Sequence, residues 1–559
     1  NRISVMPSLT AAPGGTMLAM RFECLAPRDV PHLSRLATSY FDDFGRVGSY
    51  FHHPPTLEGA RAAAAESGKG TVARDALVAA LRPLNQRLGS DASASRNLDR
   101  LSAGAVAVVT GQQTGLFSGP AYTLYKALTA IRAAADLTAH GIDAVPVFWI
   151  ASEDHDLAEV DHADWPGRAG LERIELSHSE DDLGRPVGEI PLGPAVEAAL
   201  DAASAGIDGP SAEAILSALR AAYTPGDTYA SAFGKLLARL FAGRGLILLD
   251  PHDPAVAALA APVMQNALRE NSALISALVR RGKELEHAGF HAQVKVAETA
   301  TLLFVKLEGR RIPLRTRNSS FQAGGRTFSL DDLLALSARA PSDLSPSALL
   351  RPVVQDTLLP TAACIVGPAE LAYFAQSEVV YRRLLGRMPA VLPRSGFTLL
   401  EPHVVRLLRK YGLSLRDVLR GRQHLRRRLE RESVPRALSR QMTLGERNLR
   451  RYLTRIRKPL RKLDPTLSGA LDVSESKILY QLEKLRTRAG RAADRRVELL
   501  DRHERILCEA LAPHHELQER TVCALPILAR HGLEILDALA ERANAFSDPS
   551  PNCHHLVYL

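Results

Sequence analysis

The sequence predicts an α/β protein with a parallel-sheet core, two small β-rich insertions and an antiparallel α-helical coiled-coil domain. Three observations lead to this fold class. A strand, a glycine loop, a helix and a second strand follow one another between residues 105 and 150. Two later segments alternate in polarity and contain turn residues, and an apolar repeat of about 3.5 residues begins after residue 398.

The core is predicted from short apolar runs separated by helices. Ala105–Thr110 is β-branched and apolar, which indicates a buried strand, and Tyr122–His140 has a strong helical pattern. Val145–Ile150 is a second strand, so this stretch is a βαβ unit and its strands are parallel. Leu246–Asp250 and Ala363–Gly367 are predicted as the third and fourth strands.

The flanking regions of the core are predicted from composition and turn signals. Residues 21–104 are rich in Ala, Arg and Leu and are expected to be helical. The two β-rich insertions are placed at about 163–200 and 287–340 because both contain short alternating runs with Gly and Pro punctuation. The Rossmann-type core and its insertions are assigned to residues 1–398.

A coiled-coil arm is predicted over residues 399–511. Its first apolar seam has 4-3-4-3-4 spacing and consists of Leu449, Leu453, Ile456, Leu460, Leu463 and Leu467. A second seam runs from Leu471 to Ala510, and the segment 464–469 between them is expected to turn the chain. Residues 512–559, with helix at 515–545 and a short apolar tail, are expected to pack back on the core.

Composition bounds the class of protein. The 559 residues exceed one ordinary domain, and 46% hydrophobic with 23% charged residues is typical of globular proteins. No apolar run reaches the length of a membrane helix, and the N-terminal residues lack the pattern of a signal peptide. The five cysteines are odd in number and widely spaced, with no CxxC motif. We therefore expect no disulfide framework, no zinc cluster and a reducing, cytoplasmic location.

Positive charge is concentrated in one segment. Residues 405–465 contain 20 Lys/Arg and 5 Asp/Glu, a net charge of +15, so the remainder of this +9 chain is at −6. The segment has few aromatic residues. A nucleic-acid surface, a solvated helical face and a site for nucleotide phosphate are the three interpretations.

The first candidate site is the glycine-rich loop Thr110–Lys126, between the first strand and its helix. Glycines let the backbone approach a ligand, and ligands bind at the carboxyl ends of parallel strands and at helix N-termini. The loop is neither a Walker A loop nor a GxGxxG fingerprint. The alternative is a glycine turn that only packs the helix. Residues expected to bind substrate here are Gln112, Gln113, Gly115, Ser118, Gly119, Tyr122 and Lys126.

The second candidate site follows the second strand, in the sequence WIASEDHD. Three acids and a histidine within four residues are costly unless they are solvated, paired or bound to something. The acids are candidates for binding Mg²⁺ or a substrate ammonium, and the histidine for a general base or an anion ligand. The alternative is a helix N-cap at Ser152. The residues of this site are Trp149, Ser152, Glu153, Asp154, His155 and Asp156.

The third candidate site combines two segments, 345–360 and 366–373. In a helix, Arg351, Gln355 and Asp356 share approximately one face, and Gly367 with Glu370 and Tyr373 follows the fourth strand. These side chains are expected to face the same crevice. The alternative is an internal salt bridge between Arg351 and Asp356 or Glu370.

The three sites, in this order, resemble the BshC family, the cysteine ligases of bacillithiol biosynthesis. The matching stretches are VTGQQTGLFSGPAYTLYKALTAI, VPVFWIASEDHDLAEVDH, GFHAQV, SPSALLRPVVQDTLLPT, VGPAELAYFAQ, MPAVLPR and HELQER. The resemblance implies a Rossmann-like core with two connecting insertions and a coiled-coil arm that forms a homodimer. It also implies addition of L-cysteine to glucosaminyl-malate, the last step of bacillithiol synthesis.

The resemblance and the residues together define the expected chemistry. ATP is the expected source of activation, although the HxGH and KMSKS signatures of nucleotide-binding relatives are absent. Mg²⁺ is a candidate ion, and no dedicated metal site is expected. Glu153, Asp154 and His155 are assigned catalytic roles, and the other residues of the three sites bind the small-molecule substrates. The alternative functions are nucleic-acid (tRNA-like) binding through the basic arm, which ranks below the enzyme, and a purely structural role.

Overall fold

The computed structural model describes residues 20–31, 33–167, 170–318, 320–432, 436–492, 497–543, 546 and 553–559. The N-terminal residues on which the signal-peptide expectation rests lie outside this range. Within the described residues, no helix has both the length and the apolar character needed to cross a membrane.

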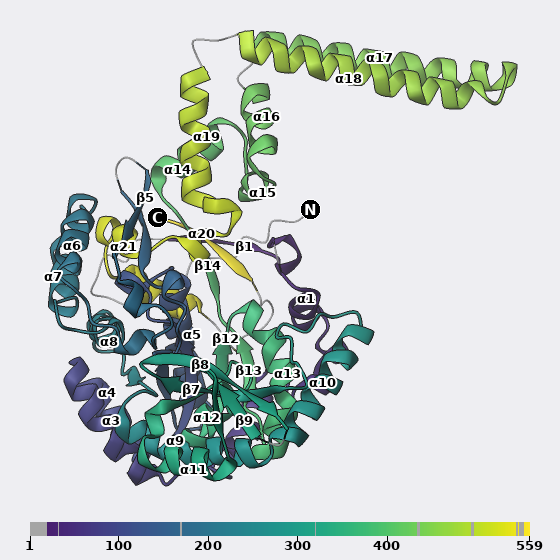
Figure 1. Cartoon of the computed structure of the whole chain (residues 1–559). Coiled ribbons are helices and arrows are strands. Elements are labelled where there is room, and N and C mark those ends of the chain that lie inside the picture. The colour runs from purple at the N-terminus through teal and green to yellow at the C-terminus, as the bar shows by residue number, and fades with distance from the viewer. Residues whose placement is uncertain are drawn as a thin grey trace.

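A five-stranded parallel sheet forms the centre of the molecule (Figure 1). The four predicted core strands are confirmed, and a fifth short strand was not predicted. In spatial order the strands are β13 (Ala390–Pro393), β12 (Thr361–Val366), β2 (Val106–Gln112), β3 (Ala144–Ile150) and β6 (Ile247–Leu249).

The order of the strands creates a topological switch point between β2 and β12. The chain proceeds from β2 through β3 to β6 on one side, and then returns to build β12 and β13 on the other side. The connections therefore diverge from the β2–β12 pair, which leaves a crevice at the carboxyl ends of these strands. In open α/β sheets this crevice is where ligands bind.

Helices cover both faces of the sheet, which explains why its strands are apolar on both sides. Val106 and Val108 pack with alanines of α2 and α5, whereas Ala107 and Val109 face the larger core on the other side. The helices of the core are α1 (Arg35–Asp42), α2 (Leu57–Glu66), α3 (Arg74–Leu88), α4 (Ala92–Ala103), α5 (Tyr122–Ala139), α6 (Ala195–Ala205), α7 (Ala212–Ala222), α8 (Tyr229–Leu240), α9 (Pro254–Arg269), α10 (Asn271–His287), α11 (Leu330–Arg339), α12 (Arg351–Leu358) and α13 (Pro368–Leu384).

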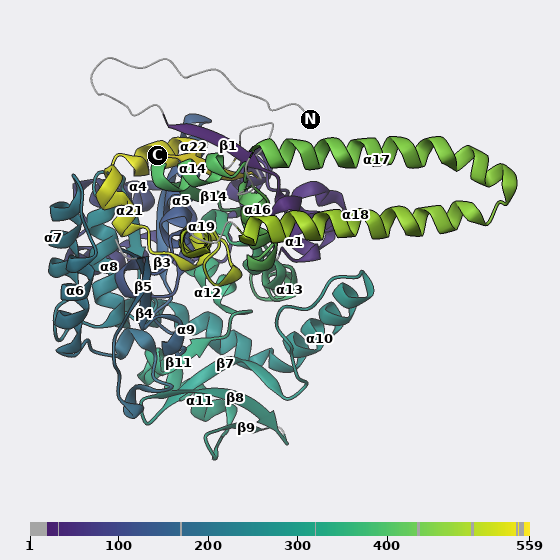
Figure 2. The same ribbon diagram turned by 90° about the horizontal axis from the view of Figure 1, so that it is seen from above.

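The two predicted insertions differ in character. The first begins with a single hairpin, β4 (His162–Pro166) and β5 (Leu171–Glu175), and then continues through short turns into α6. The second forms a five-stranded antiparallel sheet beside the core sheet (Figure 2). Its strands are β10 (Arg326–Phe328), β9 (Ser320–Ala323), β8 (Arg310–Arg317), β7 (Ala300–Leu307) and β11 (Leu344–Pro346).

The two ends of the described chain meet in a third sheet. The strand β15 (His554–Tyr558) pairs antiparallel with β1 (Arg21–Leu25) and parallel with β14 (Gly396–Leu400). The expectation of helix from residue 21 is therefore wrong for β1. The reason is that β1 obtains its hydrogen-bond partners from the opposite end of the chain, which local composition does not reveal.

The cysteine prediction is also corrected. Cys24 and Cys553 form a disulfide across this third sheet, with their Cα atoms 5.6 Å apart. They are separated by 529 residues in the sequence, so only the pairing of β1 with β15 brings them together. Cys364, in the predicted fourth strand, and Cys523 are buried free thiols.

The predicted antiparallel arm is confirmed. The helices α17 (Arg436–Leu463) and α18 (Leu467–Ala492) lie side by side and project away from the body of the molecule (Figures 1 and 2). The chain reverses between them at residues 464–466. The helices at the base of the arm and after it are α14 (Pro402–Lys410), α15 (Leu415–Leu419), α16 (Arg422–Glu432), α19 (Val497–Leu511), α20 (Gln518–Thr521), α21 (Leu525–His531) and α22 (Ile535–Arg542).

Candidate active site

A cavity of about 550 Å³ lies at the switch point of the core sheet. It receives side chains from the carboxyl ends of β2 and β3, from the loop after β12 and from the second insertion. The structure therefore brings the three predicted sites into one place. The predicted residues that line the cavity are Gln112, Gln113, Tyr122, Lys126, Trp149, Glu153, Asp154, Arg351, Gly367, Glu370 and Tyr373.

Lys126 is a buried cation on α5 that reaches the end of β2. Its Nζ donates to the carbonyl oxygen of Gly111 and to Oε1 of Gln112, both at 2.9 Å. It also forms an ion pair with Oε2 of Glu370 at 2.5 Å. Burial lowers the pKa of Lys126, and the Glu370 carboxylate opposes part of that shift. The pair joins the glycine loop to the start of α13.

Glu370 also organises the loop after β12. It accepts a hydrogen bond from the backbone N–H of Gly367 at 2.7 Å, which closes the first turn of α13. The hydroxyl of Tyr373 donates to its other oxygen at 2.9 Å. Burial alone raises the pKa of Glu370, but Lys126 and Arg351 reverse the shift and keep it below its usual range.

Arg351 presents a guanidinium to the cavity from the start of α12. It donates to the hydroxyl of Tyr373 at 2.8 Å and to Oε1 of Gln355 at 3.2 Å. The alternative salt bridge of Arg351 with Asp356 or Glu370 is not formed within 4 Å in the described residues. Because its partners are neutral groups, the positive charge of Arg351 is available to an anionic ligand.

Glu153 is a cavity acid without a hydrogen bond or close ion pair among the described residues. It follows β3, and burial raises its pKa to about 7, with Arg311 and His252 limiting the shift. A carboxyl group with this pKa exchanges a proton readily near neutral pH. This property suits a general acid or base.

Asp154 lies in the opposite electrostatic environment. Burial alone raises its pKa, but hydrogen bonds from His155 and Gln113 and the nearby Arg311 hold it well below its usual range. The side-chain amide of Gln113 donates to Asp154 at 2.8 Å and to Glu159 at 2.5 Å. Asp154 therefore stays charged and can bind a cationic group.

The loop after β3 is not a helix N-cap. Residues 151–156 are irregular, and the only regular turn that follows is a single 3₁₀ turn at Leu157–Glu159. Ser152 is fully buried and donates to Asp250, so it holds the loop against the end of β6. Asp156 is exposed on this loop and does not line the cavity.

The second insertion supplies a cation that sequence reasoning missed. Arg311 on β8 lies over the ring of Phe304 at 3.8 Å and donates to the carbonyl oxygen of Pro346 at 2.7 Å. Its Nη1 is 3.1 Å from Nδ1 of His155, and His155, which was predicted to be catalytic, does not line the cavity. No signal in the sequence distinguished Arg311 from the other arginines of the insertion.

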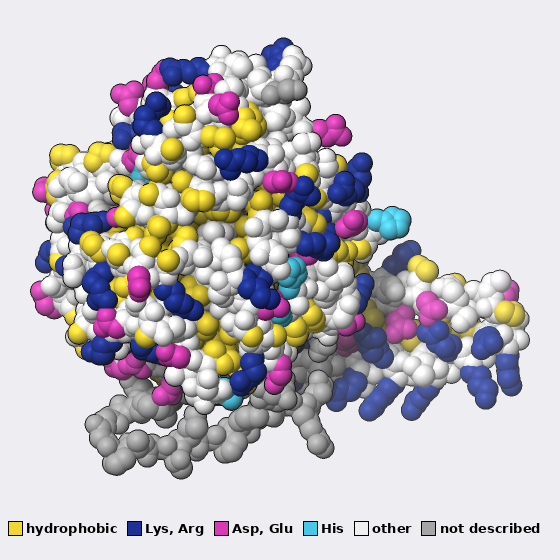
Figure 3. Space-filling model, turned by 90° about the horizontal axis from the view of Figure 1, so that it is seen from below, with side chains coloured by type: hydrophobic (Ala, Val, Ile, Leu, Met, Phe, Trp, Pro, Cys, Tyr) yellow, Lys and Arg dark blue, Asp and Glu magenta, His cyan; other side chains and the backbone are white. Residues whose placement is uncertain are grey.

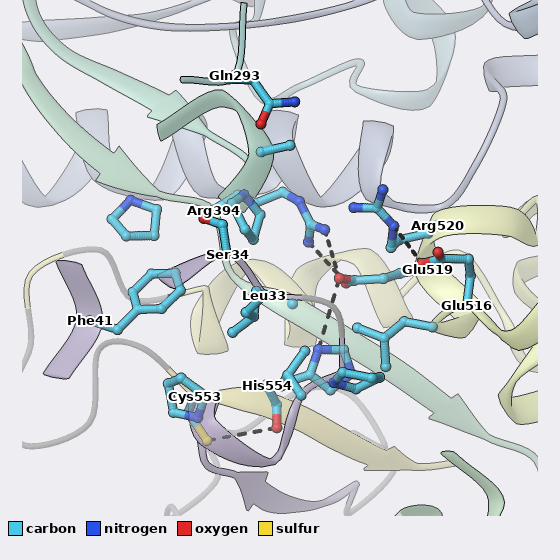
Figure 4. Close-up of a pocket in the computed structure, with 18 of the residues that line it drawn as sticks. Leu33, Ser34, Phe41, Gln293, Arg394, Glu516, Glu519, Arg520, Cys553 and His554 are labelled. Atoms are coloured by element: carbon cyan, nitrogen blue, oxygen red, sulfur yellow. Dashed lines mark hydrogen bonds and ion pairs between the residues drawn. The ribbon is translucent and has the colours of Figure 1, made fainter. Parts of the chain in front are cut away.

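The C-terminal segment closes the other side of the cavity. Arg520 of this segment lines it, together with Arg394 from the connection after β13. Arg394 is paired with the buried Glu519 at 2.6 Å. An adjoining cavity of about 310 Å³ shares these two arginines with the first (Figure 4). Arg394 and Arg520 lie in the stretches MPAVLPR and HELQER, so the family resemblance is the sequence signal that points to them.

The glycine loop contributes less to the cavity than predicted. Gly115, Ser118 and Gly119 do not line it. Phe117 and Ser118 have φ of 52° and 78°, and this tight turn buries the ring of Phe117 against Trp165 and Tyr223. The prediction that these three residues bind substrate is therefore not supported by the cavity. This part of the loop is a turn that packs against the core, as in the alternative interpretation.

Two further predicted residues support the cavity from behind. Gln355 and Asp356 are fully buried, and neither lines the cavity. Asp356 accepts a hydrogen bond from the hydroxyl of Tyr381, and burial raises its pKa. The helical spacing placed these residues near Arg351 correctly, but the core-facing side of α12 turns them away from the ligand space.

The cavity offers carboxylates for a cation but no preformed metal cage. Within the described residues, no group of three or more His, Cys, Asp or Glu side chains has the arrangement of a metal site. Mg²⁺ commonly takes one or two carboxylates together with substrate phosphates. Glu153 and Asp154 fit that role only together with a bound phosphate.

The fold and the site define a Rossmann-like α/β enzyme with a coiled-coil arm, whose switch-point cavity combines acids with buried cations. The family models describe the same two parts. Residues 20–395 match "Bacillithiol biosynthesis BshC, N-terminal Rossmann-like domain", and residues 397–557 match "Bacillithiol biosynthesis BshC, C-terminal coiled-coil domain". The chain belongs to the BshC family.

Relatives from several bacteria carry the name "Putative cysteine ligase BshC". The protein of Koribacter versatilis is 42% identical over 93% of this chain and 97% of its own length. That of Solibacter usitatus is 39% identical over 92% of this chain and 96% of its own length. That of Symbiobacterium thermophilum is 31% identical over the full length of both chains. The chain is thus a member of a ligase family.

Proposed function

We propose that the protein joins the carboxyl group of L-cysteine to the amine of glucosaminyl-malate and so completes bacillithiol. One observation carries the proposal. A single cavity places Glu153 and Asp154, which suit a substrate ammonium, together with Arg351, Arg311 and Arg520, which suit carboxylates. Cysteine contains an ammonium, and the malate moiety contains two carboxylates.

Ion pairs within the protein indicate which charged residues are available to bind the substrates. Lys126 pairs with Glu370 and Arg520 pairs with Glu516 at 3.0 Å, so Arg351, which has only neutral hydrogen-bond partners, is the cation proposed to bind the malate carboxylates. Asp154 stays charged and is proposed to bind the cysteine ammonium. Gln112 donates to the hydroxyl of Tyr122 at 3.0 Å, and this pair is proposed to bind the sugar hydroxyls.

Amide formation requires an activated carboxyl group, because a free carboxylate does not react with an amine at neutral pH. We propose that ATP supplies this activation: a carboxylate oxygen of cysteine bonds to the α-phosphorus of ATP and pyrophosphate leaves, with Mg²⁺ bound to the phosphates. The glucosamine nitrogen then forms a bond to the cysteine carbonyl carbon, and the bond to the nucleotide breaks. Glu153, with a pKa of about 7, is proposed to accept the proton lost by the attacking amine.

The test is product formation by the purified protein. The protein is incubated with ATP, cysteine and glucosaminyl-malate, and bacillithiol is measured by mass spectrometry. We expect bacillithiol and one AMP for each molecule formed. If the protein makes none alone but does so with an added partner protein, the proposal of a self-sufficient ligase fails.

We also propose that the protein is a homodimer assembled through the arm. Apolar side chains remain exposed on both helices of the arm, including Tyr452 at 59%, Leu463 at 80% and Leu485 at 56% of their full exposure. A two-helix hairpin cannot bury both sides of its apolar seams by itself. A second copy of the arm offers the same surface with the same repeat.

A further inference from the structure

Basic residues form a continuous stripe along α17. Its members are separated by 7, 4, 4, 3 and 4 residues, and in a helix of about 3.6 residues per turn these spacings fall on one face. All six side chains are exposed. The stripe consists of Arg440, Arg447, Arg451, Arg455, Lys458 and Lys462.

The stripe faces away from the rest of the arm. Leu453, which is buried, points toward α18, and the helical spacing places the stripe on the opposite side of α17. Figure 3 shows dark blue Lys and Arg side chains in a row along one edge of the arm. The stripe is therefore open to a partner even when the apolar side of the arm is covered.

The charge of the stripe is not neutralised by the protein. None of its six members forms an ion pair with a described residue. Arginines on the flank of the same helix behave differently. Arg450 pairs with Glu446 and Glu475, and Arg457 pairs with Asp472. The acids of the arm thus compensate the flank and leave a line of unpaired positive charge.

The length of the stripe matches a regular polyanion. From Arg440 to Lys462 the helix rises about 33 Å at 1.5 Å per residue. One turn of a nucleic-acid duplex is about 34 Å long and carries a phosphate charge about every 1.7 Å of its axis. The stripe itself contains no aromatic side chain, so it lacks the stacking groups that recognise single-stranded bases.

We infer that this stripe binds the phosphodiester backbone of a double-stranded nucleic acid. The contact is electrostatic and independent of base sequence, because every group in the stripe is a cation that recognises phosphate. From the sequence alone, nucleic-acid binding ranked below the enzyme. The structure of α17 adds that these charges are aligned on one face and are not paired with acids of the described residues. The inference does not depend on the proposed ligase reaction.

The test measures binding of the full-length protein to fluorescently labelled RNA and DNA hairpins by anisotropy over a series of salt concentrations. The triple variant R447Q/R451Q/R455Q removes the centre of the stripe. The control R96Q/R269Q/R339Q removes three exposed arginines of the core and changes the net charge equally. Circular dichroism verifies that both variants keep the helical arm.

We expect the wild type and the control to bind both hairpins, with affinity that falls steeply as salt rises. In the stripe variant, affinity drops by at least about tenfold, and the slope of log affinity against log salt becomes shallower by about 2–3. Tighter binding of one hairpin identifies RNA or DNA as the preferred duplex. Equal loss in both variants, or tighter binding to anionic phospholipid vesicles than to either hairpin, overturns the inference.

Discussion

Adjacent acids after β3 have opposite properties because their surroundings differ. Glu153 lacks a hydrogen-bond partner and has a pKa of about 7, whereas Asp154 accepts hydrogen bonds from Gln113 and from the backbone of His155. Pairs of acids whose pKa values are pushed apart frequently divide proton transfer from charge stabilisation. Glu153 is therefore the proposed base, and Asp154 the proposed anchor for a cation.

Substitution E153Q tests this division through the pH profile. We expect the wild-type kcat/KM to rise as pH increases through about 7, because Glu153 must lose its proton to act as a base. In E153Q the rise through this region disappears and kcat falls by about 10²-fold or more. The measurement is initial rate of product formation between pH 5.5 and 8.5.

Stability supplies an independent check on the same residue. The folded-state pKa of Glu153, about 7, lies above its ordinary value of 4.5, so the folded protein holds an extra proton between these limits. Glu153 therefore lowers stability as pH rises through this window. E153Q should unfold at a higher temperature than the wild type above pH 7. Equal unfolding temperatures there would remove the basis for the raised pKa.

At the residue scale, sequence patterns identified side chains at strand ends but not those that arrive from elsewhere. Gln112 ends a core strand, and Glu153 and Glu370 follow core strands, so the parallel sheet itself places them in the crevice. Arg311 reaches the cavity from an insertion, and Arg520 from the C-terminal segment. Their positions depend on tertiary packing, which leaves no local pattern.

At the element scale, the contact of β2 with β3 requires glycine at position 111. A Cβ atom there would lie 2.8 Å from the carbonyl oxygen of Trp149 and 2.9 Å from its Cβ. Trp149 is fully buried and cannot shift easily. The first glycine of the loop therefore lets two strands approach, and its carbonyl oxygen holds Lys126.

Substitution G111A tests this packing. We expect a loss of about 1–3 kcal/mol of unfolding free energy, because the added methyl group overpacks the strand pair. Chemical denaturation measures the change. The control is G445A in α17, where nothing lies within 4 Å of the new Cβ. G445A should keep or raise stability by up to about 1 kcal/mol. Similar stability of G111A and wild type would contradict the close approach.

The link between the C-terminal segment and the core is another element-scale feature. The buried pair of Arg394 and Glu519 joins the connection between β13 and β14 to α20, and Glu519 also accepts a hydrogen bond from the backbone N–H of Phe397 in β14 at 2.9 Å. Burial raises the pKa of Glu519, but Arg394 reverses the shift and lowers it overall. This contribution to stability is present above the ordinary Glu pKa and is lost as pH falls.

Substitution E519Q leaves the buried guanidinium of Arg394 without its counter-charge. We expect about 3 kcal/mol of destabilisation at pH 7 and a smaller difference from wild type at pH 3. Urea denaturation at the two pH values measures both numbers. A constant difference between the two proteins at both pH values would show that the ion pair does not carry the effect.

Helices and strands were predicted well where a repeating pattern of apolar residues marks them. They were predicted poorly where a strand pairs with a strand far away in the sequence. The βαβ unit has strong patterns in its two strands and its helix, so its ends agree closely with the structure. The repeat in the arm predicted the helical hairpin, but the first seam begins at Leu449, whereas α17 begins at Arg436. The strands β1 and β15 are five residues each and exist because they pair with each other. The four-residue β13 is similarly too short to give a period.

At the scale of the whole molecule, the arm is the surface proposed to join two copies. Leu463 and Leu485 are exposed in the single chain, so replacing them changes the surface without disturbing the core. The double variant L463S/L485S should shift the protein toward monomer in light scattering after size exclusion. The control L183S changes an exposed leucine of the body, and it should leave the dimer intact. A wild-type protein that is monomeric in this measurement would contradict the proposed dimer.

The cavity at the switch point of the core sheet is the proposed substrate site. Titration calorimetry with glucosaminyl-malate tests this claim without the need for the activation step. Substitution R351Q should weaken binding by about 10–100-fold, because it removes a charged hydrogen-bond donor from the cavity. The control R382Q removes a mostly exposed arginine on α13 outside the cavity and should bind like the wild type. Binding by R351Q as tight as that of the wild type would contradict the account.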